Sequence, residues 1–270
     1  MKKKWMLFLA AGLVYLLFLH DLEGIIRDRS RTSFLTDKSV YSAGFRRQQL
    51  PEALYQKLHK TAGENGDWIG LLTASMLDGK FLPEKLSSSG KVYQIYKKNE
   101  YEALKNAYRA IWQDIEYFPV ASHDVFFEDT WLAERDYGGK RLHEGTDLFG
   151  KEDISGYYPV ISMTDGIVEK IGWLPLGGYR IGIRSPGGGY FYYAHLSSYE
   201  KEFLPGENVN AGDILGYMGN TGYGPAGTRG RFPVHLHLGI YIAVKNNREL
   251  SVNPYWVLKN SEKKIRNYTY

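Results

Sequence analysis

The chain has 270 residues, a formal net charge of +4 and no cysteine. That length accommodates one sizeable domain and a smaller one. The lack of cysteine excludes disulfides and thiolate metal sites, so any zinc has to be held by histidine and carboxylate. The first fifty residues carry nine Lys/Arg against four Asp/Glu, and the remainder carries 25 against 26. The basic excess therefore indicates a membrane-proximal segment, and nothing in it favours a nucleic-acid partner.

Residues 1–22 contain three lysines followed by fifteen apolar residues from Trp5 to Leu19. As a helix this run spans roughly 22 Å, short of the ~30 Å hydrocarbon core, and its length is typical of a signal peptide. The following residues, from His20 to Glu23, contain no small-residue cleavage site, which favours an uncleaved anchor in the cytoplasmic membrane with its basic end inside. Both interpretations predict export of the rest of the chain.

Residues 23–47 are polar and basic and are interpreted as a tether across the membrane surface. Helical patterns follow over residues 48–118, where Pro51 is typical of a helix start and Asn99 with Glu102 resembles a capping box. Apolar residues then recur at helical spacing: Leu54, Leu58, Trp68, Leu71, Leu72 and Met76, and later Leu104, Tyr108, Ile111, Trp112 and Ile115. We expect a small helical region whose stripes form a core, with a docking surface for a protein partner as the alternative.

The composition changes after the helical region, because 22 of the 30 glycines lie from Gly138 onward. Glycine-rich turns between short alternating runs such as 179–183 predict strands joined by tight turns. We therefore expect a mainly β domain over residues 119–260, followed by a tail at 261–270. Residues 219–227 form a long glycine-rich loop, which is interpreted as a wall of a substrate groove or as a connector.

The sequence His235-Leu236-His237 lies in the last strand-like run. Side chains alternate in an extended strand, so His235, His237, Gly239 and Tyr241 share one face, and Leu236, Leu238, Ile240 and Ile242 the other. The second face is uniformly aliphatic and belongs against a core. The first face presents two neighbouring imidazoles, and neutral imidazole is a favoured zinc ligand.

Two further places carry histidines in strand-like runs. On a strand His143, Gly145 and Asp147 share a face, and the glycine leaves room between the two ligand-type side chains. His195 follows the aromatic run that begins at Phe191. Each histidine alone is more typical of an ordinary polar residue. The three places together indicate a metal site.

The order HxxxD, then Tyr-Ala-His-Leu, then His-Leu-His resembles the lysostaphin-type zinc metallopeptidases, the endopeptidases of bacterial peptidoglycan. The likeness covers roughly 137–255 and includes the segments 162–168 and 206–216. It implies antiparallel sheets forming a groove, preceded here by the helical region and the N-terminal membrane segment. It also implies hydrolysis of stem or cross-bridge peptides of peptidoglycan, at the outer face of the cytoplasmic membrane or in the cell wall.

The resemblance further assigns the ligands of one zinc ion per chain. It implies that His143, Asp147 and His237 hold the zinc and that water fills the fourth position. That leaves the zinc site with a net charge of about +1, which acidifies the bound water and polarises the scissile carbonyl.

The resemblance assigns proton transfer to His195 and His235 as a pair, and which of them accepts the proton is open. Tyr137 lies six residues before His143, where family members place a tyrosine that stabilises the oxyanion. An ordinary tyrosine at the end of a strand is the alternative.

The sequence leaves three alternatives. His143-Glu144 resembles the opening of a helical HExxH zinc motif, but Asp147 stands in place of its second histidine and Gly145 disfavours a helix. A non-catalytic envelope-binding or regulatory module of the same fold would lack a zinc residue, and none is missing here. A scaffold in envelope assembly is the third. The segment 228–234 departs from the family pattern before the last motif and leaves the bond preference open.

Overall fold

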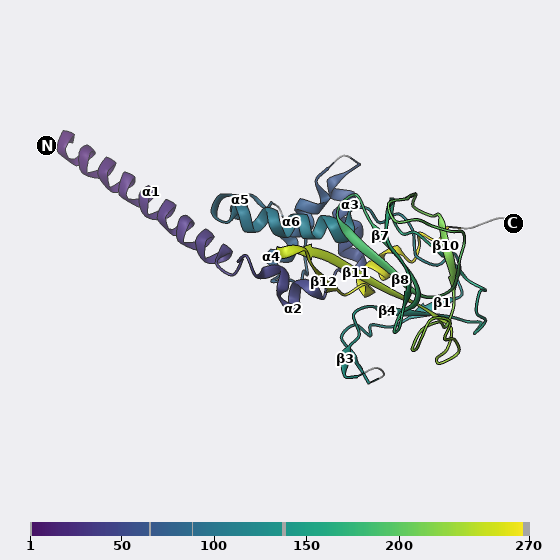
Figure 1. Ribbon diagram of the computed structural model, residues 1–270. Coiled ribbons are helices and arrows are strands. Elements are labelled where there is room, and N and C mark those ends of the chain that lie inside the picture. The colour runs from purple at the N-terminus through teal and green to yellow at the C-terminus, as the bar shows by residue number, and fades with distance from the viewer. Residues whose placement is uncertain (1, 65, 88, 137–138, 267–270) are drawn as a thin grey trace.

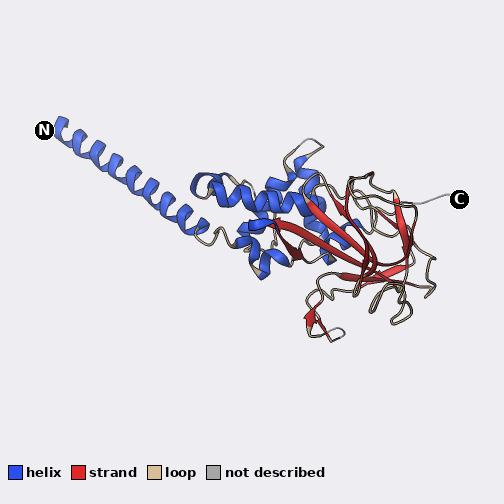
Figure 2. Ribbon diagram, viewed as in Figure 1, coloured by secondary structure: helices blue, strands red, loops and turns tan. Residues whose placement is uncertain are grey.

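The computed structural model describes residues 1–270 except 1, 65, 88, 137–138 and 267–270. A long N-terminal helix leads into a group of shorter helices, which pack against a β-sheet body (Figures 1 and 2). The helices are α1 Lys2–Thr32, α2 Ala43–Arg46, α3 Glu52–Ala62, α4 Trp68–Asp78, α5 Lys91–Tyr96, α6 Lys98–Trp112 and α7 Tyr255–Ser261, with 3-10 turns at Ser39–Tyr41 and Lys245–Asn247. The fold is therefore mainly β in its C-terminal part and helical in its N-terminal part, as expected.

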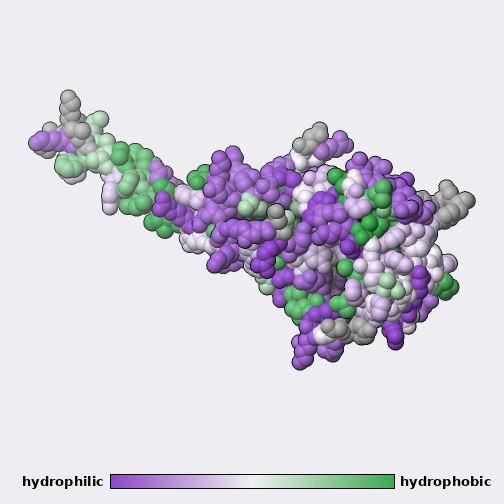
Figure 3. All heavy atoms as spheres, viewed as in Figure 1, coloured by the Kyte–Doolittle hydropathy of each residue, from purple (hydrophilic) through white to green (hydrophobic). Residues whose placement is uncertain are grey.

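Helix α1 projects away from the body, and most of its outer half is apolar behind a hydrophilic tip (Figure 3). From Lys4 to Thr32 it is long and apolar enough to cross a membrane, and its apolar stretch has no buried part. An apolar helix near the N-terminus is thus present, and both a membrane anchor and a signal sequence fit it.

The segment expected to be a tether is partly folded into the body. Helix α1 continues to Thr32, and the residues after it include Leu35 and Phe45, both fully buried. These two side chains join the main hydrophobic core, while the basic residues Lys38 and Arg47 stay at least partly exposed. The segment was expected to be a tether because of its basic composition, which does not indicate that isolated apolar residues hold it to the core.

The expected helical stripes are buried. Leu54 and Leu58 of α3 and Leu104, Tyr108 and Ile111 of α6 lie in the core. The expected capping box is wrong, because α6 begins at Lys98 with Lys97 as its N-cap and no side chain caps it. The start of this helix is determined by packing of its apolar face and not by a capping side chain.

The described strands form a ten-stranded sheet and a separate two-stranded hairpin. The strands are β1 Val125–Phe127, β2 Glu134–Arg135, β3 Arg141–Leu142, β4 Thr146–Gly150, β5 Pro159–Ile161, β6 Gly166–Leu174, β7 Gly178–Arg184, β8 Gly189–Tyr199, β9 Asn208–Val209, β10 Ile214–Met218, β11 His235–Val244 and β12 Arg248–Val252. The main order is β1-β4-β11-β8-β7-β6-β9, with β12 beside β11, β10 beside β8 and β5, and β2 paired only with β3. All these pairs are antiparallel.

The faces of the central strands follow the alternation expected from the sequence. On β11, Leu236, Leu238 and Ile240 have no exposed surface, and the histidines lie on the other face. Helix α6 packs against β8 and β11, and the helical and β residues form one continuous core. The strands that carry the histidines are therefore supported from behind by the helices.

The C-terminal end of α1 is held to the helical region by Asp78. Its carboxylate accepts hydrogen bonds from Arg31 at 2.6 and 3.0 Å, from Ser87 at 2.7 Å and from Tyr93 at 2.9 Å. Burial opposes ionisation of Asp78, but these bonds prevail and lower its pKa. One partly buried carboxylate thus joins α1, α4 and α5.

We predict that Asp78→Ala lowers the free energy of unfolding by about 2 kcal/mol, because three donors lose a charged acceptor. Thermal unfolding of the full chain in detergent measures this change. Asp37→Ala is the matched control, since its ion pair with Lys245 is exposed on both sides and surface pairs of this kind contribute little. Equal melting temperatures for the two variants would contradict the assigned role of Asp78.

Candidate metal centre and groove

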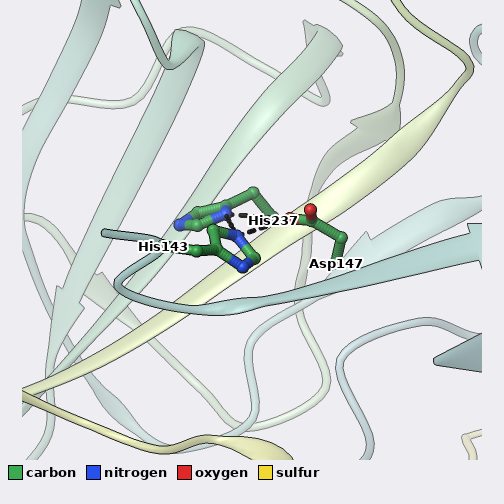
Figure 4. A group of neighbouring side chains, drawn as sticks. All are labelled: His143, Asp147 and His237. Atoms are coloured by element: carbon green, nitrogen blue, oxygen red, sulfur yellow. Dashed lines mark hydrogen bonds and ion pairs between the residues drawn. The ribbon is translucent and has the colours of Figure 1, made fainter. Parts of the chain in front are cut away.

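The pairing of β11 with β4 brings together residues that lie ninety positions apart in the sequence. His237 is directly opposite Asp147 in this pair, and Leu238 is opposite Thr146. Opposed residues on one face of an antiparallel pair lie about 5 Å apart at Cβ, so their side chains meet. His143 lies just before β4 and turns toward the same point (Figure 4).

Three donor atoms converge there, one from each side chain. His143 Nε2 is 3.0 Å from Asp147 Oδ1 and 2.9 Å from His237 Nδ1, and the last two atoms are 3.0 Å apart. Around tetrahedral zinc with bonds of about 2.0–2.1 Å, donor atoms lie roughly 3.3–3.4 Å apart. Two imidazoles and one carboxylate in this arrangement fit a zinc ion with one position left for water or substrate.

The protonation of these groups also suits a metal. Burial opposes ionisation of Asp147, but its hydrogen bonds with His143 and His237 prevail and hold its pKa well below the usual range. Burial lowers the pKa of His237 and keeps its imidazole neutral. Ionised carboxylate and neutral imidazole are the forms that bind metal ions.

Outer contacts orient two of the donors. The Thr130 carbonyl lies 3.0 Å from His143 Nδ1 and accepts its proton, which leaves Nε2 free for a metal. Arg135 donates to Asp147 Oδ2 at 3.0 Å and leaves Oδ1 facing the histidines. Neither residue was predicted from the sequence, because a backbone acceptor has no sequence signal and Arg135 lies outside any recognisable pattern.

His195 and His235 form a second pair beside the three donors, with ring centroids 4.7 Å apart. Their Nδ1 atoms lie 2.8 Å from the carbonyl oxygens of Thr221 and Pro233. A carbonyl can only accept, so each Nδ1 carries hydrogen and each neutral ring has a free lone pair on Nε2. Burial lowers the pKa of both imidazoles, and His235 Nε2 lies 3.8 Å from Asp147 Oδ1. Both rings are therefore available as bases next to the donor group.

The backbone at His195 is unusual, because its φ of 63° is in the left-handed region. Between the pairs Tyr179↔Leu196 and Ile181↔Tyr193, β8 contains one more residue than β7, and this makes a bulge. Bulges redirect side chains, and left-handed backbone at a residue other than glycine costs of order 1–3 kcal/mol. The bulge turns the His195 side chain into the groove. Side-chain alternation along β8 does not predict this orientation.

The segment 228–234, which departs from the family pattern, contributes an aromatic cover to the two histidines. The Phe232 ring lies 4.6 Å from that of His195 and 5.0 Å from that of His235, measured between centroids. It also packs against Tyr223 of the preceding loop at 4.7 Å. The glycine-rich loop and the segment after it therefore form a wall of the site.

The donor group and the histidine pair open into one groove of about 760 Å³. Glu144 lies exposed at its edge, and no helix forms between His143 and Asp147, so the helical HExxH arrangement is absent from this segment. Tyr137 lies outside the residues that the structure describes. Of the six site residues named from the sequence, the other five lie around this groove.

Comparisons with known proteins agree with this geometry. Residues 141–254 match the family model described as Peptidase family M23. The chain is 41% identical over 160 residues to the L-Ala--D-Glu endopeptidase of Bacillus subtilis, a match covering 58% of this chain and 47% of that protein. It is 35% identical over 97 residues to the glycyl-glycine endopeptidase ALE-1 of Staphylococcus capitis, covering 35% of this chain and 23% of that one. The chain thus spans about half the length, or less, of these curated relatives.

A solved structure extends the similarity to most of the chain. The crystal structure of a Ruminococcus gnavus protein, named after the glycyl-glycine endopeptidase lytM, is 44% identical with a TM-score of 0.74. The alignment covers 86% of this chain and 95% of that chain. The likeness therefore includes much of the helical region as well as the sheet.

We predict that Gly145→Ala weakens zinc binding at least tenfold. A Cβ at this position would lie 2.5 Å from His237 Cε1 and 2.5 Å from the Leu238 carbonyl oxygen, so the His237 ring has to move. Zinc affinity is measured by competition with a chromogenic chelator. Gly24→Ala, where an added Cβ meets open space, is the control. Wild-type affinity in Gly145→Ala would show that the His237 ring position is not needed for zinc.

Proposed function

This chain belongs to peptidase family M23, and we propose that it is a zinc-dependent endopeptidase that hydrolyses stem or cross-bridge peptides of bacterial peptidoglycan. One observation carries the proposal: a convergent group of two imidazoles and a carboxylate shares a groove with two neutral histidines whose Nε2 atoms are free. Relatives named for the L-Ala–D-Glu and glycyl-glycine bonds support the reaction class and supply the two bonds to test first.

We propose that His143, Asp147 and His237 hold the zinc. Zinc bound there supplies a Lewis acid that polarises the scissile carbonyl and acidifies water. His143 is buried and Asp147 and His237 are half-buried, and Arg135 keeps the Asp147 carboxylate oriented with Oδ1 toward the two imidazoles. The site is thereby preorganised before substrate enters the groove.

Proton transfer is proposed for His195 and His235. Nε2 of one imidazole takes the proton of the attacking water, and the resulting imidazolium passes it to the leaving amine. During this cycle Nδ1–H of each ring stays bonded to its backbone carbonyl, which holds the tautomer and stabilises the charged ring. Phe232 packs over both rings and limits competing water. Tyr137 is proposed to stabilise the oxyanion.

We further propose how the chain is arranged at the cell surface. Residues 1–22 anchor it in the cytoplasmic membrane, residues 48–118 form a helical region that offers a surface to a protein partner, and residues 119–260 are the peptidase domain on the outer side. Helix α1 supports this arrangement because its apolar part is exposed and its far end is attached to the body through Arg31.

We predict that substitutions of the proposed metal ligands and of the proposed bases differ in their effect on zinc content. His143→Ala, Asp147→Ala and His237→Ala leave only two protein donors and should purify with little zinc and no activity. His195→Ala and His235→Ala should keep close to one zinc per chain and lose about 10²–10⁴-fold in rate, because proton transfer is lost. Metal analysis beside mass spectrometry of digested peptidoglycan measures both properties.

The two classes of variant serve as controls for each other. Loss of zinc from His235→Ala with retention in His237→Ala would exchange the roles of these two residues. Full activity in all five variants would show that the groove is not the active site.

We predict that intact protein is found in the membrane fraction, with the peptidase domain accessible to external protease in spheroplasts. The three lysines before the apolar run favour this orientation. A soluble secreted form that starts near residues 21–30 would contradict the anchor and leave export in place.

A further inference from the structure

Arg180 is a charged residue of the groove that the proposed mechanism does not use. It lies on β7, where Ile181 and Ile183 have no exposed surface and belong to the core. Alternation along the strand therefore places Arg180 on the opposite face, and it lines the groove with Tyr190 and Tyr192 of β8. Arg180 thus lies at the groove, on the strand beside the one that carries His195.

Arg180 has no acidic partner among the residues that the structure describes. Its Nη1 is shielded from solvent and makes no hydrogen bond there. The nearby carboxylates of Glu169 and Glu249 both contact Arg184 at 2.6 Å. A shielded N–H without an acceptor costs of order 1–3 kcal/mol, and more when the group is charged. Arg180 lines the groove, and its charge has no carboxylate partner in the described part of the chain, so the position favours an anionic group that a ligand brings.

The surrounding side chains cannot neutralise Arg180. Burial raises the pKa of Tyr190 to about 12, and burial likewise raises the pKa of Tyr192. Both residues are thus neutral phenols at physiological pH. The other groove arginines have partners that Arg180 lacks, since Arg135 pairs with Asp147 at 3.0 Å and Arg141 donates to the Tyr223 hydroxyl at 3.1 Å. Arg141 Nε, like Arg180 Nη1, makes no hydrogen bond among the described residues.

We propose that Arg180 is a carboxylate-binding subsite and that the preferred substrate carries a free carboxylate close to the scissile bond. A guanidinium group presents paired N–H donors that match the two oxygens of a carboxylate. This inference rests on the proposed endopeptidase function and adds a chemical class of substrate to it. An uncharged glycine bridge offers no such group within the chain, so the subsite favours an acidic peptide.

The sheet sets the distance between this subsite and the donor group. Strand β8 separates β7 from β11, and at about 4.8 Å per strand the backbones of Arg180 and His237 lie roughly 10 Å apart. An extended peptide advances about 3.3 Å per residue, so the carboxylate is expected within two or three residues of the cleaved bond. The side chain of an acidic residue and a nearby chain terminus both meet this requirement.

The test compares synthetic peptides that contain an L-Ala–D-Glu bond and differ in one group. The first pair carries the free D-Glu carboxylate or its carboxamide, and the second pair carries a free or amidated C-terminus. For zinc-loaded wild type we expect a preference of about 10- to 100-fold in kcat/KM for the carboxylate form of one pair. In Arg180→Gln this ratio should fall below about threefold.

Two further variants make the test specific. Arg180→Lys keeps the charge but not the paired donors, so its ratio should fall between those of wild type and Arg180→Gln. Arg248→Gln removes an exposed arginine of β12 outside the groove and should keep the wild-type ratio. The pair whose ratio changes identifies the source of the carboxylate, an acidic residue or the chain end. An unchanged ratio in Arg180→Gln would overturn the subsite.

The subsite and the proposed function can fail separately. If wild type hydrolyses none of the peptides, the proposed function fails for this bond, and calorimetric titration of the same peptides tests the subsite alone. Tighter binding of the carboxylate form to wild type than to Arg180→Gln supports the subsite. Equal affinity of wild type for the carboxylate and carboxamide forms overturns it.

Discussion

The register of β11 against β4 is the constraint on which the rest of the site depends. His237 meets Asp147 only because these two residues are directly opposite each other. A shift of one residue would turn Leu236 and Leu238 toward the groove and bury the histidines, which the apolar core opposes strongly. A shift of two residues would keep the faces but move the ligand-type side chains about 6.6 Å apart along the strands. The apolar core therefore excludes a shift of one residue. The observed register of β4 against β11 excludes a shift of two residues.

Sequence patterns predicted this part of the site because the relevant information lies in alternation. The aliphatic face of β11 assigned His235 and His237 to the open face, and Gly145 indicated room between His143 and Asp147, where the His237 ring now lies. The mainly β fold and the buried helical stripes were predicted for the same reason. Periodicity reports which side of an element faces a core.

Features without periodicity could not be predicted. The bulge at His195 depends on how many residues two paired strands contribute, which neither strand shows alone. The groups that accept from His143 and His195 are the backbone carbonyls of Thr130 and Thr221. Every residue has such a carbonyl, so the sequence does not indicate which one is used. The capping box failed for a related reason, since an exposed capping pattern at Asn99 is weaker than the packing of the α6 stripe.

The four histidines of the groove differ in the hydrogen-bond partner of Nδ1. In His143, His195 and His235 a backbone carbonyl accepts from Nδ1, so each ring presents only Nε2 to the groove. His237 is the opposite case, because its Nδ1 faces the Asp147 carboxylate and its other edge lies over Gly145. Two of the carbonyl-bound rings lie beside the donor group and one lies within it. Position relative to Asp147 therefore separates the proposed ligands from the proposed bases, whereas the tautomer alone does not.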